Sequence, residues 1–411
     1  MKLAGVAIDH LISTTAFIAA IVLFTGLFTQ TLQAAILYQQ NRHIASKASD
    51  ILDNILLNPG YPYHWGTTND TLSCFGLQKL GATGYVEDAF ALMRLTTLLD
   101  DPIEYPIGSG RYFNNVTFGP TGFMFIPIAD SIDYPTASRL LGINGTYGFE
   151  LNIAPLVQVV ISVHQQNPLK LRVDVAGPGF PLGGADISYY FFKSIKGTNY
   201  PNLELDTGTA KADSAGVAYI NFTFDGTRET FTIVAYASLS GLTGSGYFTQ
   251  QTFSKGAGVM PFVVNYEEGK VYLAHSWDVQ DQGAPVPNFF YNASFMILTE
   301  DLQFENWPIA NSTGTVNYGG GGGKYLYGET VVPVGQPGFL LVTYLSGNDV
   351  GMSIMPWGVG TLSVPVLFGN LSPSEVWTAS DLRQITVDLV AYQAKLTCWS
   401  LQGYEIWKSP V

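Results

Sequence analysis

The stretch AIDHLISTTAFIAAIVLFTGLFTQTLQAAILYQQN, from Ala7 to Asn41, is the feature on which the fold depends. No charged side chain occurs between His10 and Asn41. A helix needs about 20 apolar residues to cross the hydrocarbon core of a bilayer, so the stretch is long enough to span a membrane. The segment NRHIASKASDILDNILLN continues the apolar pattern at helical spacing up to the turn signal at 58–60. The pattern predicts one helix over 10–57, about 72 Å long at 1.5 Å per residue, apolar on all sides first and amphipathic later.

Three interpretations fit this segment: a cleaved signal peptide, a permanent membrane anchor, or the core of a larger assembly. A signal peptide has a shorter apolar core and a small-residue cleavage site, whereas the helical pattern here continues through Ala34 and Ala35. Small residues, which let helices approach closely, favour association between copies, although they are common in single spans too. The small residues are Ala16, Ala19, Ala20, Gly26, Ala34 and Ala35.

The composition of the chain restricts its partners. With 411 residues it is long enough for two or three domains. Charged residues make up 12%, against about 25% in an average soluble protein, so sugars or neighbouring molecules are expected to cover much of the surface. The net charge of −13 argues against nucleic acid as a partner, because nucleic acid requires clustered Lys and Arg.

Acceptor sequences for N-linked glycans occur only after the long helix. The pattern Asn-x-Ser/Thr implies an external face where it is used. Arg42 and Lys47, after the span, favour the opposite orientation under the positive-inside rule, but Asp50 and Asp53 partly offset them. We therefore expect the part after the helix to face the outside and to carry N-linked glycans. The acceptors are Asn69, Asn115, Asn144, Asn221, Asn292, Asn311 and Asn370.

Cysteine occurs only twice, at Cys74 and Cys398. In an oxidising compartment the two predict one disulfide that closes almost the whole region after the helix. The alternative is a pair of buried free thiols. No spacing typical of a zinc site is present.

The remainder of the chain divides by pattern. Short helical and strand patterns alternate over 59–166, and alternating apolar residues with turn signals about every ten residues predict a β-sandwich over 167–255. A second β-rich region covers 256–411. The predicted fold class is α+β and mostly β, with the long helix at 1–58, a small α/β region, and two β-sandwich-like domains.

The order of segments in 1–165 resembles archaeal type IV pilin-like and pseudopilin-like surface proteins. The resemblance rests on the long apolar helix running into ILDNILLNPGYPYHWG, followed by CFGL, FALMRL and YPTASRLLGINGTYGFELNI. It implies a helix that anchors the protein in the membrane and, in true pilins, forms the filament core. The beginning MKLAGVAID matches the basic leader of such proteins only loosely, which leaves cleavage near Gly5 open. The phrases PLGGADISY, ADSAGVAYINFTF and TFTIVAYAS resemble immunoglobulin-like surface modules, which act as spacers and adhesive units.

Patterns for chemistry are weak throughout. The glycine-rich segment 318–328 lacks the Ser or Thr of a phosphate-binding loop. The carboxylates in 206–216 and 278–283 suit turns at least as well as calcium. No nucleophile-elbow motif occurs. We therefore expect no catalytic residues, no metal and no cofactor.

Together these features predict a structural glycoprotein at the cell surface. It is expected to be a pilin-like subunit of an extracellular filament, or a minor or tip component, that binds copies of itself through the helix and sits in the lipid bilayer before assembly. The alternative is a monomeric, membrane-anchored adhesin or a solute- or glycan-binding protein.

Overall fold

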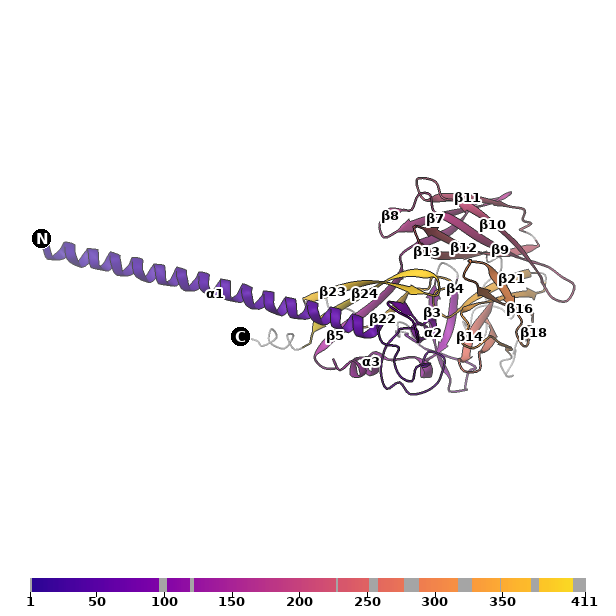
Figure 1. Ribbon diagram of the computed structural model, residues 1–411, viewed down its shortest axis with the longest axis horizontal. Coiled ribbons are helices and arrows are strands. Elements are labelled where there is room, and N and C mark those ends of the chain that lie inside the picture. The colour runs from indigo at the N-terminus through magenta and orange to yellow at the C-terminus, as the bar shows by residue number, and fades with distance from the viewer. Residues whose placement is uncertain are drawn as a thin grey trace.

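A computed structural model describes residues 2–95, 102–118, 122–226, 228–250, 258–276, 288–316, 327–347, 349–370 and 377–401. Its dominant feature is α1 (Lys2–Leu56), an unbroken helix of 55 residues that projects from a β-rich head formed by the described residues from 57 onward (Figure 1). The long N-terminal helix is confirmed. It begins eight residues before His10 and ends one residue before Leu57.

The end of α1 is fixed by the residues that follow it. The Leu57 N–H still donates to the Asp53 carbonyl over 2.9 Å, and the Gly60 N–H then donates to Asn58 Oδ1 over 2.9 Å. Pro59 has no N–H to continue the helix. Gly60 takes a φ of 75°, a conformation that favours glycine, and the chain turns away from the helix axis.

The last quarter of α1 lies on a five-stranded sheet in the order β1-β23-β24-β5-β22 (Figure 1). Every neighbouring pair is antiparallel except β1 and β23, which are parallel. The strands are β1 (Val86–Glu87), β5 (Tyr147–Pro155), β22 (Val366–Gly369), β23 (Thr378–Val387) and β24 (Val390–Ser400). The central strand β24 buries eight of its 11 residues, and its neighbour β5 buries four of nine.

A six-stranded sheet in the order β19-β15-β14-β4-β3-β2 lies further from the helix. It joins early and late parts of the chain, because β14 pairs in parallel with β4 through Phe262 and Phe125. The strands are β2 (Ile103–Glu104), β3 (Tyr112–Phe118), β4 (Gly122–Pro127), β14 (Val259–Asn265), β15 (Lys270–His275) and β19 (Gly328–Val331).

Strands β6 to β13 form a sandwich of two antiparallel sheets around a hydrophobic core of their own. One sheet has the order β10-β9-β12-β13, and the other has the order β11-β7-β6 with β8 beside β7. The strands are β6 (Gln158–Gln166), β7 (Leu169–Gly177), β8 (Phe180–Pro181), β9 (Asp186–Ile195), β10 (Asn202–Lys211), β11 (Val217–Phe222), β12 (Glu229–Leu239) and β13 (Leu242–Thr249). Strand β7 alternates buried and half-buried residues, as its sequence predicts.

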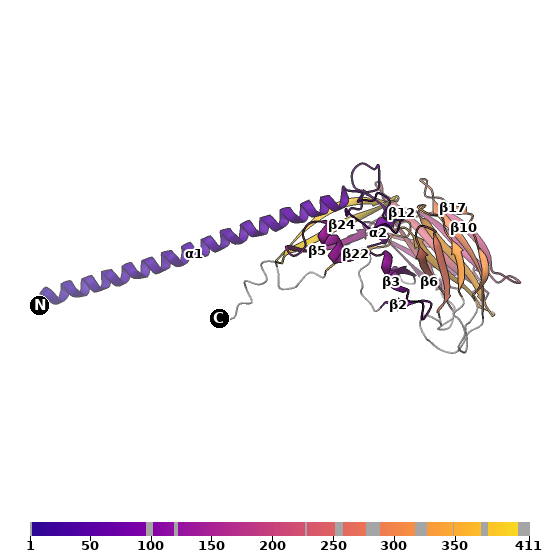
Figure 2. The same ribbon diagram turned by 90° about the horizontal axis from the view of Figure 1, so that it is seen from below.

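A further sheet, in the order β17-β16-β20-β21 with β18 beside β16, completes the head at the end away from α1 (Figures 1 and 2). Its strands are β16 (Phe289–Leu298), β17 (Phe304–Trp307), β18 (Thr313–Val316), β20 (Gly338–Ser346) and β21 (Asp349–Trp357). The short helices are α2 (Ala89–Met93), η1 (Ile128–Asp130) and α3 (Tyr134–Leu140). Asp88 and Asp133 cap α2 and α3 by accepting backbone N–H groups.

The fold class, mostly β with one long N-terminal helix, is confirmed. The expected division of the head at residues 166 and 255 does not follow its sheets. Strand β6 precedes residue 167 and pairs with β7. The other strands of 59–166 lie in two sheets, and the region 256–411 supplies strands to both, so these two regions share one hydrophobic core.

Candidate assembly site: the N-terminal helix and its seat

The first part of α1 is exposed along its whole length. Every residue of 11–36, which we call the rod, is exposed, including large apolar side chains such as Leu23 and Phe24. By length and composition α1 is apolar enough in this part to cross a membrane, and none of its most apolar window is buried. Apolar surface of this extent is unfavourable in water, so the rod requires lipid or protein around it.

Hydroxyl groups along the rod are already bonded within the helix. Thr15, Thr25, Thr29 and Thr31 each donate to the carbonyl oxygen four residues earlier, over 2.8 Å. A threonine that bonds in this way presents its methyl group outward and needs no external partner for its hydroxyl. These four threonines are therefore compatible with an apolar environment.

The small residues predicted to allow helix packing are all exposed on the rod. At about 100° per residue, five of the six fall within an arc of about 120°. These five are Ala16, Ala19, Ala20, Gly26 and Ala34, while Ala35 lies on another side. Phe17, Phe24 and Phe28 share an arc of about 40° centred about 120° away from the small residues. Ile12, Leu23 and Leu27 fall within the same arc as the small residues. The shallow part of the arc is therefore the patch of Ala16, Ala19 and Ala20, which we call the smooth side, and the phenylalanines form the bulky side.

The last part of α1, residues 44–56, which we call the base of the helix, is held by the head. Its buried residues recur every three or four positions and face β23 and β24, whose contact surface we call the seat. Leu52, Ile55 and Leu56 have no exposed surface. The buried set is Ile44, Ala48, Ile51, Leu52, Ile55 and Leu56.

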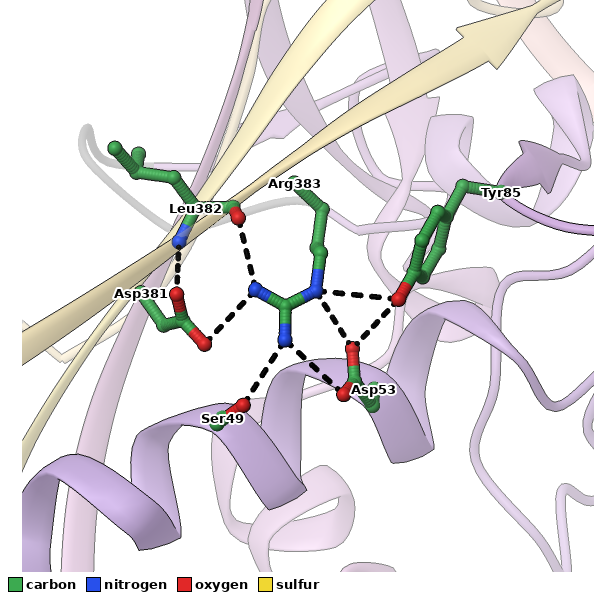
Figure 3. A network of polar contacts seen from close by, with 6 residues as sticks. All are labelled: Ser49, Asp53, Tyr85, Asp381, Leu382 and Arg383. Carbon is green, nitrogen blue, oxygen red and sulfur yellow. Dashed lines mark hydrogen bonds and ion pairs between the residues drawn. The ribbon is translucent and has the colours of Figure 1, made fainter.

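A polar network fastens the helix to the seat (Figure 3). Arg383 on β23 donates from Nε to Asp53 Oδ1 over 2.9 Å and from Nη2 to Asp53 Oδ2 over 3.1 Å. Nη2 also donates to Ser49 Oγ over 2.9 Å, and the Tyr85 hydroxyl donates to Asp53 Oδ1 over 3.0 Å. Bonding to Asp53 is the main cause that raises the pKa of Arg383. A bidentate arginine–carboxylate pair also fixes the orientation of both partners.

The second side of the guanidinium is held by β23 itself. Arg383 Nη1 lies 2.9 Å from Asp381 Oδ2 and donates to the Leu382 carbonyl over 2.9 Å. The network therefore restricts sliding and rotation of α1 on the seat. The sequence did not reveal it, because Asp53 and Arg383 are 330 positions apart.

The predicted disulfide between Cys74 and Cys398 is wrong, since both are free thiols in the structure. Cys74 accepts a bond from the Asn58 side chain over 3.2 Å, just beyond the end of α1. Cys398 is buried on β24 within electrostatic range of Lys47. Cys74 thus lies near position 58 and Cys398 near position 47, and two such positions are about 16 Å apart along a helix axis. A disulfide requires the Cα atoms of its two cysteines to lie within about 7 Å of each other. Burial raises the pKa of the Cys398 thiol to about 11.

The glycan acceptors differ in accessibility. All seven lie on the head, and six are exposed: Asn69, Asn115, Asn144, Asn221, Asn311 and Asn370. Asn292 is half-buried in the middle of β16, between β18 and β20. An enzyme that adds glycans needs an accessible side-chain amide, so the folded head presents six acceptors well and Asn292 poorly.

The segments considered for calcium or phosphate binding show no such site among the described residues. In the turn within 206–216, the Asp213 carboxylate accepts the N–H groups of Ala215 and Val217 over 2.8 and 3.0 Å, which is ordinary turn chemistry. The segments 278–283 and 318–326 lie outside the described residues. Within the described part of the chain, no group of three or more His, Cys, Asp or Glu side chains is placed to hold a metal ion.

The site that the structure presents is therefore a helix with an exposed apolar rod and a seated base. No family model and no curated protein sequence matches this chain.

Proposed function

We propose that this protein is a pilin-like subunit of an extracellular filament, in which the rods of many copies pack together and the glycosylated heads face outward. The observation that carries the proposal is the rod, because an unbroken helix projects from the head with its apolar side chains uncovered (Figure 2). An assembly of rods covers this surface without any other partner.

The length of the uncharged stretch that contains the rod favours an assembly of helices over a single membrane span. The uncharged stretch 10–41 has 32 residues and is about 48 Å long as a helix, whereas the hydrocarbon core is about 30 Å thick. An average tilt of about 20° still leaves a span of about 45 Å. The exposed side chains of Leu32, Ile36 and Tyr38 lie at the excess end. A bundle of helices covers them, whereas a lone anchor leaves them beyond the hydrocarbon.

The two sides of the rod are complementary in shape. The small residues around Ala16 and Ala20 leave a shallow surface, and the side of Phe17 and Phe24 projects from the helix. Packing of helices in an apolar medium depends on close van der Waals contact, because burial from water no longer drives it. The bulky side of one rod can fill the smooth side of another, which suits repeated contacts along a fibre.

The second candidate is a membrane-anchored adhesin or receptor that stays monomeric. It is favoured by the apolarity of the rod, which meets the requirement for one membrane span. The seat on the head serves this function as well, since it would hold the head at a fixed distance from the bilayer.

One pair of substitutions tests the proposal. Ala20→Leu fills the smooth side, and Ile21→Leu changes a neighbouring position on another side while keeping the apolar character. We expect wild-type protein and Ile21→Leu to form filaments in electron micrographs of the cell surface, and Ala20→Leu to form at most short ones. Both variants should enter the membrane normally. Monomeric protein in every sample, including wild type, would support the anchored alternative instead.

A further inference from the structure

Two acidic side chains lie at the junction where several parts of the head meet. Strand β1 pairs with β23 and leads directly into α2. The segment 358–364, after β21, packs against α2, and the Val359 N–H donates to the Ala89 carbonyl over 3.0 Å. The same segment accepts the Tyr236 hydroxyl of β12 through the Thr361 carbonyl over 2.5 Å. The junction thus joins the helix-bearing sheet to the sandwich.

Glu87 on β1 is buried in this junction. Its side chain has no exposed surface, and neither carboxyl oxygen has a hydrogen-bond partner among the described residues. Its neighbour Asp88, which caps α2, contributes a like charge, and no basic side chain of the described residues is among the causes that shift the pKa of Glu87. Burial, followed by the charge of Asp88, raises the pKa of Glu87 to about 9.

Asp388 is at the turn between β23 and β24, directly after the residue that pairs with Glu87. It has a φ of 48°, and the residue as a whole is half-buried, but its Oδ2 atom is buried without a partner among the described residues. Lys79 and Asp88 act on this carboxyl electrostatically, and Asp388 in turn contributes to the raised pKa values of the Tyr236 and Tyr392 hydroxyls. Burial outweighs the opposing effect of Lys79 and raises the pKa of Asp388 to about 7.

We propose that Glu87 and Asp388 make the junction an acid-set seal, in which both side chains pack as neutral acids and loss of their protons loosens the head. A neutral carboxyl group can be buried at modest cost, whereas an unpaired carboxylate in the same place is strongly unfavourable. The seal is a property of the head alone and does not depend on filament assembly.

The sign of the pH dependence follows from the direction of both shifts. The folded state holds protons that the unfolded chain releases above about pH 4, so unfolding becomes easier as the pH rises. Each such proton increases the unfolding equilibrium constant by up to about tenfold per pH unit. We expect the unfolding equilibrium constant to rise by up to about 100-fold per pH unit between pH 5 and 7, where both groups contribute. Between pH 7 and 9, where Glu87 alone contributes, we expect it to rise by about tenfold per pH unit.

The test compares thermal and urea unfolding of the full-length chain in detergent micelles from pH 5 to pH 9. Glu87→Gln should abolish the decline of stability between pH 7 and 9. The stability of the double variant with Asp388→Asn should be nearly independent of pH over the whole range. Glu305→Gln and Asp349→Asn remove one exposed carboxylate each and control for net charge. The stability of both control variants should decline with rising pH as the stability of the wild-type protein does.

A wild-type measurement keeps the test independent of how the variants fold. Infrared spectra at pH 7 should show the band of a protonated carboxyl group in the folded protein, and this band should disappear on unfolding. A wild-type protein without such a band, or a double variant that declines as steeply as wild type, would overturn the proposal.

Discussion

Residues 11–36 and residues 44–56 belong to one helix, but their surroundings are opposite. Leu23 is 67% exposed, whereas Leu52 has no exposed surface. Both residues are leucines within the same unbroken helix, so helix propensity does not distinguish them. The difference arises from what the described part of the head provides: a seat for residues 44–56 and no covering surface for the rod.

The comparison shows how an apolar pattern should be interpreted. A pattern with one apolar face, as in 44–56, is satisfied within its own chain. A stretch that is apolar on all sides cannot be covered by a single sheet. Its partner must surround it, which is why lipid or other copies are the two candidates for the rod.

The largest expected effect separates the two leucines. Leu52→Ala should lower the free energy of unfolding of the head by about 2–5 kcal/mol, because it leaves a cavity under the seat. Leu23→Ala should change it by less than about 0.5 kcal/mol. Urea unfolding in detergent, followed by tyrosine and tryptophan fluorescence, measures both. Equal losses would mean that the rod folds against the head.

The polar network should have the next largest effect. Arg383→Ala leaves the Asp53 carboxylate without its cation and should cost about 1–2 kcal/mol, since the pair is only partly exposed. The matched control is Lys211→Ala, which breaks the exposed pair with Asp186 and should cost close to zero. Spin labels on α1 and on the head should report a wider spread of distances in Arg383→Ala. An unchanged distribution would show that apolar packing alone fixes the helix.

The cysteines provide a chemical test of how the base is held. Free thiols mean that a reductant should leave the melting temperature unchanged and that two thiols should titrate after unfolding without reductant. In the folded protein at pH 8, iodoacetamide should alkylate Cys74 faster than Cys398. The Cys398 thiol is buried with a pKa of about 11, so only about one molecule in 1,000 carries the thiolate. Loss of stability on reduction would instead show a disulfide.

The smallest effect on stability is expected at the predicted glycan acceptors of the head. Mass spectrometry of protein from a glycosylating host should find glycans at exposed positions such as Asn144 and Asn311, and little at Asn292. Replacement of Asn144 by Gln should leave unfolding nearly unchanged, because the side chain lies in an exposed turn. High occupancy at Asn292 would show that glycans are added before β16 pairs with its neighbours.

The sequence predicted features that depend on nearby residues. The uncharged stretch and the following amphipathic pattern were sufficient for α1, and alternation in segments such as 169–177 was sufficient for strands. Pairings between distant segments were not predictable. The parallel pairing of β14 with β4 joins Phe262 to Phe125, and no local pattern encodes it. This is why 256–411 was expected to be a separate domain.

The candidate site was only partly predictable, because some of its residues are neighbours in the sequence and others are far apart in it. The small residues of the rod are visible in the sequence because they lie within one helix. The contact between Asp53 and Arg383 depends on the placement of β23, which the sequence does not give. The expected disulfide was wrong because the number of cysteines carries no information about the distance between them. Here Cys398 lies near Lys47 of α1, whereas Cys74 contacts Asn58 beyond the end of that helix.

The seat on β23 and β24 has a consequence for biogenesis. These strands occupy residues 378–400, whereas α1 ends at residue 56, so the ribosome adds more than 300 residues after the helix before its binding surface exists. Throughout translation, Leu52 and its neighbours have no native surface to cover them. A chain cut short before β23 would therefore carry a helix base that is exposed to chaperones and proteases. The helix can therefore attach to its seat only after β24 has been synthesised.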